Sequence, residues 1–263
     1  SGFIGRVGDD PFGALMQRTL LTEGVDITYL KQDEWHRTST VLVDLNDQGE
    51  RSFTFMVRPS ADLFLETTDL PCWRHGEWLH LCSIALSAEP SRTSAFTAMT
   101  AIRHAGGFVS FDPNIREDLW QDEHLLRLCL RQALQLADVV KLSEEEWRLI
   151  SGKTQNDRDI CALAKEYEIA MLLVTKGAEG VVVCYRGQVH HFAGMSVNCV
   201  DSTGAGDAFV AGLLTGLSST GLSTDEREMR RIIDLAQRCG ALAVTAKGAM
   251  TALPCRQELE SEK

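Results

Sequence analysis

The sequence predicts an α/β fold built on a mostly parallel central sheet. Strand-like and helix-like patterns alternate along the chain, and strands separated by helices of about 10 to 15 residues are typical of βαβ units. Two of the strands, A-D-V-V-K-L and A-M-L-L-V-T, are apolar almost without interruption, which indicates a sheet buried on both faces. A length of 263 residues suits a single domain of this class.

The first part of the chain predicts a strand, a helix and a separate hairpin. Residues 1–8 have the character of a strand already in progress, and residues 9–23 carry apolar side chains at helical spacing before Gly24. Two β-rich runs, 38–45 and 51–57, are joined by a polar turn at 46–49. Because these runs alternate polar and apolar residues, we expect the hairpin of residues 38–57 to form a small lid beside the main domain.

The remaining elements follow the βαβ pattern. Gly106 and Gly107 separate a helix from the next strand, and Arg186 and Gly187 form the turn of a second hairpin. The sequence predicts strands at 78–82, 107–112, 138–142 and 170–175, a hairpin of 181–185 with 188–192, and helices at 91–104, 123–137, 143–150, 157–168, after 206 and at 225–245.

Composition and charge exclude several classes of protein. A chain with 44% hydrophobic and 24% charged residues is neither disordered nor collagen-like. The net charge of −11 argues against a general nucleic-acid binder, and no apolar run reaches the roughly 18 to 20 residues of a membrane helix. The eight cysteines include no C-x-x-C pair and most lie in apolar stretches. We therefore expect reduced, buried thiols, with a redox or metal role as the alternative, in a cytoplasmic protein without a signal peptide.

The run D-S-T-G-A-G-D at residues 201–207 carries the clearest chemistry. Three small residues directly before a helix let backbone N–H groups converge on an anion, and the helix dipole adds to the attraction. Asp207 would then hold a carboxylate beside a bound phosphate. The pattern is neither a P-loop nor a dinucleotide-binding fingerprint. A glycine-containing turn capped by Asp207 explains the same residues, so both interpretations remain open.

This run and five further motifs in matching order resemble the ribokinase-like (PfkB-type) carbohydrate kinases, especially their fructokinase branch. The further motifs are G-R-V-G-D-D-P-F-G, F-D-P-N-I-R, K-L-S-E-E-E-W, V-T-K-G-A-E-G and A-V-T-A-K-G-A. The resemblance implies a three-layer α/β/α fold in which residues 1–263 form one kinase domain. In that family a further segment with a strand, a sugar-binding Asp and a Gly-Gly…Asn turn precedes the first motif. We therefore expect the natural protein to begin earlier.

The resemblance also implies roles for individual residues. Asp207 would remove the proton from the attacking sugar hydroxyl, and Gly204, Ala205 and Gly206 would form the anion hole for the transferred phosphoryl group. Glu146 would orient water on Mg²⁺, although a capping box with Ser143 explains the S-x-x-E pattern as well. A strand-to-hairpin turn is the alternative for the glycines of the nucleotide loop. The implied ATP-binding residues are Ser143, Thr175, Gly177, Gly180 and Gln237.

Two further groups complete the implied site. Asp112, Asn114 and Arg116 lie at the C-terminal end of a strand, where open α/β sheets bind ligands, and we expect them at the sugar or the phosphates, with a plain turn at residues 112–114 as the alternative. Arg58 and Asp62 follow the lid hairpin and would close over the sugar, with a solvated loop as the alternative. The residues that correspond to the monovalent-cation site of ribokinase relatives are Asp201 and Thr203, with backbone oxygens around Ala243, Ala246, Gly248 and Ala252.

The expected activity is ATP-dependent phosphorylation of a sugar hydroxymethyl group, with ATP and Mg²⁺ as cofactors and K⁺ activation left open. The motifs D-P-N-x-R and K-L-S-E-E-E favour fructose as the sugar and fructose 6-phosphate as the product. Alternative substrates are 2-keto-3-deoxygluconate and aminoimidazole riboside, and a sugar- or nucleotide-binding protein without turnover is the alternative from another class. We expect no nucleic-acid or membrane partner, while a homodimer through the lid, common among relatives, stays open.

Overall fold

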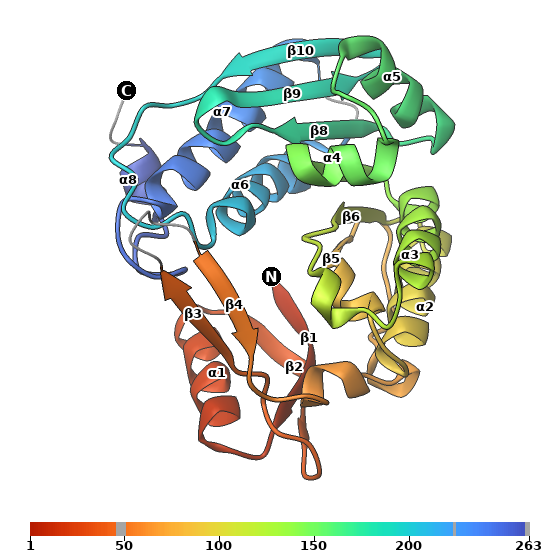
Figure 1. The fold of residues 1–263 in the computed structure, drawn as a ribbon, viewed down its shortest axis with the longest axis vertical. Helices are drawn as coiled ribbons and strands as arrows, with labels where there is room; N and C mark the ends of the chain where they lie inside the picture. Colours follow the sequence, from red (N-terminus) through yellow and green to blue (C-terminus); the bar gives the residue numbers. More distant parts are fainter. Residues whose placement is uncertain (46–50, 223–224, 261–263) are drawn as a thin grey trace. The chain divides into compact units, whose positions relative to one another are not determined.

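Strands and helices alternate along the chain in the computed structural model, which describes residues 1–45, 51–222 and 225–260 (Figure 1). The chain divides into two compact units. Unit 1 comprises residues 1–75, 81–107 and 114–136, and unit 2 comprises residues 76–80, 108–113 and 137–263. Among the described residues, no helix has both the length and the apolar character needed to cross a membrane.

Unit 2 is built on a six-stranded sheet in the order β10-β9-β8-β7-β6-β5. β6 runs parallel to β7 and β7 parallel to β8, whereas β8, β9 and β10 are antiparallel neighbours. The predicted central sheet, with its hairpin at one edge, is confirmed. The strands are β5 (Trp78–Cys82), β6 (Phe108–Asp112), β7 (Val139–Ser143), β8 (Met171–Thr175), β9 (Gly180–Tyr185) and β10 (Gln188–Ala193).

Helices cover both faces of this sheet, which confirms the three-layer arrangement within unit 2. Alternate strand residues such as Val139, Leu173 and Val183 form one buried cluster with α6 (Ala205–Thr220) and α7 (Glu226–Ala243). Successive side chains of a strand point to opposite faces. The residues in between therefore face α4 (Glu144–Ser151) and α5 (Asp157–Glu166), which contact β7 to β10 (Figure 1).

The starts of these helices follow from their local sequence. Ser143 caps α4 through its hydroxyl, and the carboxylate of Glu146 accepts a hydrogen bond from the Ser143 N–H, so the predicted capping box is confirmed. Asn156 caps α5 and Asp225 caps α7 in the same way, by accepting a backbone N–H of the first turn. A short helix, α8 (Arg256–Glu260), ends the described chain and has no counterpart in the sequence predictions.

The described part of unit 1 contains two small sheets and three α-helices. β1 (Gly2–Gly8) pairs in parallel with β2 (Asp26–Asp33), and α1 (Pro11–Thr22) connects them. β3 (Val41–Leu45) and β4 (Arg51–Phe55) form the predicted antiparallel hairpin, whose predicted turn at 46–49 lies outside the described residues. The other helices are α2 (Ser91–His104) and α3 (Glu123–Leu136), which contact each other. The sequence analysis missed β2, because its alternation of Ile27 and Tyr29 breaks at the buried Leu30.

The opening motif G-R-V-G-D-D-P-F-G has a structural role in unit 1. The Asp10 carboxylate caps α1 by accepting the N–H groups of Phe12 and Gly13, and it also accepts the backbone N–H and the hydroxyl of Thr38. The Thr38 hydroxyl in turn accepts the N–H of Gly8. These bonds tie the end of β1, the start of α1 and the strand entry at residue 38 together.

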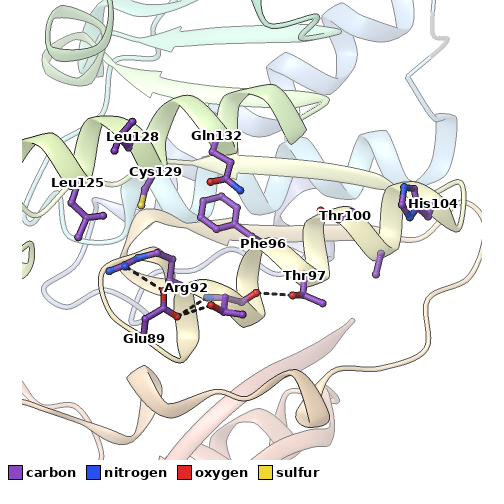
Figure 2. A pocket seen from close by; sticks show the side chains of 12 residues that line it. Glu89, Arg92, Phe96, Thr97, Thr100, His104, Leu125, Leu128, Cys129 and Gln132 are labelled. Carbon is purple, nitrogen blue, oxygen red and sulfur yellow. Dashed lines mark hydrogen bonds and ion pairs between the residues drawn. The ribbon is translucent and has the colours of Figure 1, made fainter.

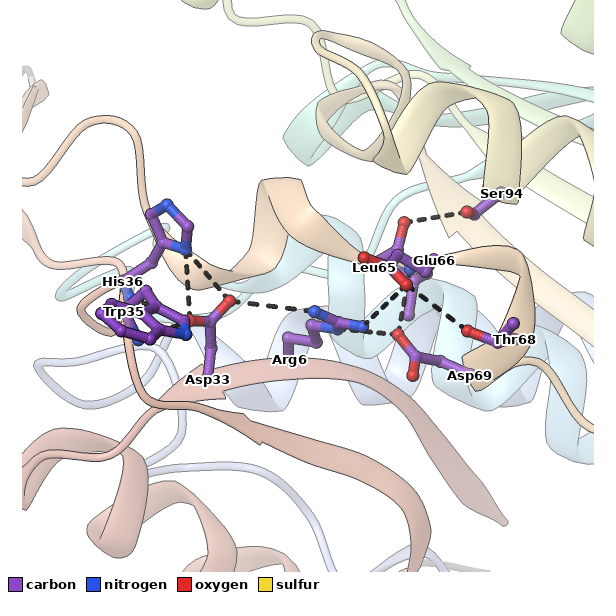
Figure 3. A network of polar contacts seen from close by, with 9 residues as sticks. All are labelled: Arg6, Asp33, Trp35, His36, Leu65, Glu66, Thr68, Asp69 and Ser94. Atoms are coloured by element: carbon purple, nitrogen blue, oxygen red, sulfur yellow. Dashed lines mark hydrogen bonds and ion pairs between the residues drawn. The ribbon is translucent and has the colours of Figure 1, made fainter.

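A partly buried ionic network is centred on Arg6 of this motif (Figure 3). The Arg6 guanidinium donates to Asp69 at 2.7 Å and lies 3.9 Å from Asp33 and 3.6 Å from Glu66. These carboxylates raise the pKa of Arg6, with the Asp69 hydrogen bond as the largest cause. The His36 ring contacts the Asp33 carboxylate at 3.1 Å. The single guanidinium of Arg6 therefore compensates part of the negative charge of three carboxylates inside unit 1.

The expectation that the cysteines are buried was only partly correct. All eight are free thiols, but only Cys129, Cys184 and Cys239 are buried, while Cys72 and two others are exposed. The apolar stretches around them were a poor guide to burial, because a strand or helix in such a stretch still turns some positions toward solvent.

Candidate active site

The N-terminus of α6 is an open anion-binding turn. Gly204 caps the helix with φ 81°, a left-handed backbone conformation that favours glycine, and no side chain caps this end. Within the described residues, the N–H groups of Gly206 and Asp207 have no hydrogen-bond acceptor, whereas Ala205 donates to the Ser202 carbonyl at 3.3 Å. Two unsatisfied N–H groups at a helix start suit an anion.

Asp207 does not act as the helix cap, so the structure disagrees with the alternative that made this residue a structural cap. Its side chain is exposed, and no hydrogen bond from the described residues engages its carboxylate. A carboxylate that faces solvent in the first turn of α6 is available to accept a proton from a bound hydroxyl group. This is the geometry that the sequence interpretation of a base beside an anion site required.

A buried ion pair lies beside this turn. Lys141 on β7 reaches Asp112 at the end of β6, and its ammonium nitrogen lies 3.2 and 3.1 Å from the two carboxylate oxygens. Both residues are buried, at 8% and 3% exposure. The Lys141 nitrogen also lies only 3.2 Å from the position that a Cβ on Gly206 would occupy. The missing side chain of Gly206 therefore makes room for a cation at the anion-binding turn.

Electrostatics couple this pair to the other acidic groups of unit 2. Burial is the main cause that raises the pKa of Asp112 from 3.8 to about 6, and the charges of Glu146 and Asp207 add to it, while Lys141 opposes them. The charges of Glu146 and Asp207 thus act on the Asp112 carboxyl group, which is paired with one ammonium group. The sequence analysis did not single out Lys141, although a lysine within the apolar strand A-D-V-V-K-L was the signal that could have identified it.

His80 is a second residue that the sequence analysis missed. Its ring nitrogen lies 3.2 Å from the Ser110 hydroxyl on the neighbouring strand, β6. Desolvation lowers the pKa of His80, and the negative charge of Asp207 opposes that effect. His80 therefore belongs to the same electrostatic environment as the carboxylate on α6.

The predicted nucleotide residues of the sheet come together at adjacent strand ends. Ser143 and Thr175 are register partners in the parallel pair of β7 and β8, and the Thr175 hydroxyl donates to the Leu142 carbonyl at 3.2 Å. The Glu146 carboxylate, buried at 8% exposure, accepts the Ser143 N–H at 2.7 Å. Ser143, Glu146 and Thr175 are therefore fixed at the carboxyl ends of parallel strands, where α/β folds bind ligands.

The two predicted loop glycines differ in whether the structure itself requires glycine at their position. Gly180 has φ 111° and a Cβ there would collide with the Phe192 carbonyl of β10, so the hairpin itself requires glycine. Gly177 faces open space and has φ 55°. The turn interpretation thus accounts for Gly180 without a ligand. Gln237 is half-buried on α7, and no described contact connects it to these loops.

The turn at Asp201 packs against the segment that follows α7. The Asp201 carboxylate accepts the N–H and hydroxyl of Thr203 on one oxygen and the Gly248 N–H on the other. The N–H groups of Val200 and Asp201 both donate to the Val244 carbonyl. The structure therefore brings Asp201, Thr203 and Gly248 together, whereas Ala243, Ala246 and Ala252 make no described contact with them. Ala252 lines a nearby cavity of about 380 Å³ that also includes Thr245 and Thr251.

The remaining predicted residues lie in unit 1. Asn114 has φ 43°, a conformation typical of a turn, and Arg116 is half-buried and donates to the carbonyl of Ile115. Arg58 is exposed and contacts the Leu119 carbonyl at 3.4 Å. One Asp62 oxygen is buried without a hydrogen-bond partner among the described residues. The side chains of Arg58 and Arg116 thus contact backbone carbonyls within unit 1.

A separate cavity of about 700 Å³ lies between α2 and α3 in unit 1 (Figure 2). Phe96, Leu128 and Cys129 contribute its apolar lining. The Arg92 guanidinium at its rim already donates to the carbonyls of Leu86 and Ser87 and to Glu89. None of the predicted site residues lines this cavity, so it is not part of the candidate active site.

Comparison of the sequence with known proteins identifies the family of this chain. The model of the pfkB family carbohydrate kinases matches residues 1–256. The chain belongs to the pfkB family. A fructokinase from Klebsiella pneumoniae is 59% identical over 260 residues, which are 99% of this chain and 85% of the relative. The aminoimidazole riboside kinase of Salmonella typhimurium is more distant, at 36% identity over 99% of this chain and 81% of the relative.

A solved structure supports the same family assignment at the level of the fold. The crystal structure of a fructokinase double mutant from Vibrio cholerae O395, in a fructose, ADP and potassium ion bound form, matches with a TM-score of 0.93. It is 49% identical in sequence, and the match covers 98% of this chain and 83% of that chain. The predicted ribokinase-like fold of this pfkB family chain is therefore confirmed.

Proposed function

We propose that the protein is an ATP-dependent fructokinase that converts fructose to fructose 6-phosphate. The observation that carries the proposal is the first turn of α6, where the exposed Asp207 carboxylate, two unsatisfied N–H groups and the ammonium group of Lys141 lie together. A phosphoryl-transfer site needs a proton acceptor next to donors for the phosphoryl oxygens. The 59% identity to a fructokinase supports fructose as the sugar.

In the proposed reaction Asp207 accepts the proton of the sugar hydroxymethyl group as its oxygen attacks the γ-phosphorus of ATP. The bond from that phosphorus to the bridging oxygen breaks, and ADP leaves. Negative charge on the transferred phosphoryl oxygens is stabilised by the turn of Gly204, Ala205 and Gly206 and by the dipole of α6. Backbone donors that are already in place need no rearrangement during the reaction, which is why such a turn is effective.

Lys141 supplies the positive charge in this proposal, and Asp112 positions it. The ammonium group lies 3.2 and 3.1 Å from the two Asp112 oxygens. A phosphoryl group at the α6 turn is within reach of the same ammonium group, because only the absent side chain of Gly206 separates them. Asp112, with its pKa near 6, can take up a proton when a bound phosphate attracts Lys141.

The residues present fit a magnesium ion bound with ATP. Mg²⁺ prefers oxygen ligands and keeps several waters, so it is usually held by one or two carboxylates and the substrate phosphates. Within the described ranges no three His, Cys, Asp or Glu side chains gather at one metal position. We therefore assign Glu146 to a water-mediated contact with Mg²⁺, which when bound would neutralise phosphate charge.

A potassium ion fits the turn at Asp201. The side chains of Asp201 and Thr203 offer oxygen atoms there, the Gly248 N–H holds the second Asp201 oxygen in place, and carbonyl oxygens are ligands of K⁺ in proteins. The Vibrio cholerae relative, crystallised in a potassium ion bound form, supports the assignment. The ion would stabilise the turn that leads directly into α6. Backbone oxygens of Ala243, Ala246 and Ala252 stay part of this proposal.

The other predicted residues keep their proposed roles. Ser143, Thr175 and Gly177 lie at or next to the strand ends proposed to bind ATP. Gly180 shapes the hairpin beside them, and we propose that Gln237 contacts adenine. For the sugar and its phosphate we propose Asn114, Arg116 and Arg58, and the hairpin of β3 and β4 as the lid.

The test measures ADP release by the purified protein at its natural length with ATP, Mg²⁺ and one sugar at a time. We expect kcat/KM for fructose to exceed that for aminoimidazole riboside and for 2-keto-3-deoxygluconate by at least about 100-fold, and NMR to locate the phosphate on the C6 oxygen. Higher kcat/KM for another sugar would overturn fructose as the substrate. Saturable ATP binding in calorimetry without ADP release from any sugar would overturn the kinase and leave a binding protein.

A further inference from the structure

Two thiols of unit 2 lie in direct contact on the face of the sheet opposite α6 and α7. Cys161 is on α5 and Cys184 is on β9, and their sulfur atoms are 3.2 Å apart. Cys161 also contacts the carbonyl of Gly187 in the β9–β10 turn at 3.5 Å. A disulfide needs sulfurs about 2.05 Å apart, so closing the bond requires a movement of only about 1 Å.

The two thiols differ in their access to solvent, and this difference determines which of them an oxidant reaches first. Cys161 is partly exposed, so a small oxidant can reach it, whereas Cys184 is buried at 2% exposure. Burial, and to a smaller degree the contact with Cys161, raises the pKa of the Cys184 thiol, so the more accessible Cys161 is the thiol placed to react first. Neither residue belongs to the proposed phosphoryl-transfer site. The pair therefore has no role yet assigned.

We propose that Cys161 and Cys184 are a redox modification site that forms a reversible intrachain disulfide. The oxidant is a low-molecular-weight disulfide such as oxidised glutathione. The Cys161 thiolate attacks one sulfur of the oxidant, which releases one thiol and leaves a mixed disulfide. Cys184 then loses its proton to solvent and attacks the Cys161 sulfur, and the second thiol leaves. Two protein thiols are oxidised, and one oxidant disulfide is reduced to two thiols.

The disulfide would fasten α5 to the sheet. α5 already packs on β8, β9 and β10 through Ile160 and Leu163, and Asp157 at its start contacts His191 of β10 at 3.0 Å. The cross-link joins positions 23 residues apart, and the closed loop contains β8 and the Gly177–Glu179 turn. Closing a loop of this size stabilises a fold mainly by restricting the unfolded chain. We expect the thermal midpoint to rise by roughly 5 to 10 °C.

The experiment treats the full chain with oxidised glutathione, blocks the remaining thiols under denaturing conditions and digests with trypsin. We expect residues 159–165 and 177–186 to appear as one disulfide-linked pair that a reductant separates, with six of the eight thiols still alkylated. Mixed disulfides at Cys161 without the linked pair, or exposed thiols that react to completion while this pair stays reduced, would overturn the proposal.

Two variants separate the site from general thiol oxidation. Cys161→Ser should lose both the linked peptides and the gain in thermal midpoint, whereas Cys199→Ser, which removes an exposed thiol of the same unit, should keep both. A linked pair without a higher midpoint would overturn the claim that the bond fastens α5. One further measurement rests on the proposed function: KM for ATP should differ less than twofold between the reduced and the oxidised protein. This outcome is independent of the peptide analysis, so failure of one proposal is distinguishable from failure of the other.

Discussion

Lys141→Met is the perturbation that tests the candidate site most directly. The substitution keeps a long apolar stem in β7 but removes the ammonium group that faces both Asp112 oxygens. Asp112 then remains buried at 3% exposure with Glu146 and Asp207 as its charged neighbours. Breaking a buried ion pair on one side leaves an uncompensated charge, so the effect should far exceed that of a surface pair.

The expected size follows from the pKa of Asp112. In the folded protein this pKa is about 6 instead of 3.8, so ionising the group costs about 3 kcal/mol more in the folded state than in the unfolded chain. Stability from a raised carboxyl pKa is fully present below pH 3.8 and is lost as pH rises through 6. Lys141→Met raises the pKa further, because Lys141 was the group that lowered it. We expect a loss of about 3 to 5 kcal/mol at pH 8 but only about 1 kcal/mol at pH 5, where Asp112 is protonated in both proteins.

Urea unfolding at pH 8 and pH 5 measures the two losses, and kcat is measured alongside. Adding Asp112→Asn to Lys141→Met should recover most of the stability at pH 8, since neither member of the buried pair then carries a charge, while kcat stays about 100- to 1000-fold below the wild type. The matched control is Lys153→Met, which breaks an exposed pair with Asp159 and should cost less than about 1 kcal/mol. Equal losses at both pH values would refute the reasoning about Asp112, and an unchanged kcat would refute the role of Lys141.

Two further predictions concern the α6 turn and the nucleotide loop. Asp207→Asn should lower kcat by about 100- to 10000-fold while calorimetry finds ATP binding within twofold of wild type, because its carboxylate makes no described bond that holds the fold; retained turnover would exclude it as the base. Gly206→Ala, at an ordinary helical φ, should cost less than about 1 kcal/mol of stability yet lower kcat by displacing Lys141. Gly180→Ala should cost more than about 2 kcal/mol of stability, because a Cβ there meets the Phe192 carbonyl. Urea unfolding and kcat measurements test both variants, and a larger loss of stability in Gly206→Ala than in Gly180→Ala would contradict this reasoning.

The spacing of apolar residues and the positions of glycine and turn residues were enough to predict most of the strands and helices of unit 2. The apolar strands around Val139 and Leu173 are buried on both faces, so their composition is almost independent of which helix covers them. Ser143 and Glu146 form a capping box whose partners are three residues apart, and such local bonds are readable from sequence. β2 was missed because its two faces do not alternate cleanly once Leu30 is buried.

The site was less predictable where it depends on contacts across strands. The D-S-T-G-A-G-D run indicated the α6 turn, since the turn and the helix are local. Lys141 and Asp112 are 29 positions apart, and only the parallel pairing of β6 with β7 brings them together. The same holds for Asp201 and Gly248, 47 positions apart. Spacing along the chain carries no information on such pairs without the strand order.

The charges around the α6 turn indicate why this site needs cations as well as a base. Asp112, Glu146 and Asp207 influence one another electrostatically, and Lys141 is the ammonium group among them. With all three carboxyl groups ionised, their sum with Lys141 is a net charge of about −2, which by itself repels a nucleotide triphosphate. Two features reduce that repulsion: Asp112 titrates near pH 6 and can lose its charge, and ATP arrives with its own divalent cation. Protonation of Asp112 therefore lowers the negative charge beside the α6 turn, where the exposed Asp207 carboxylate lies.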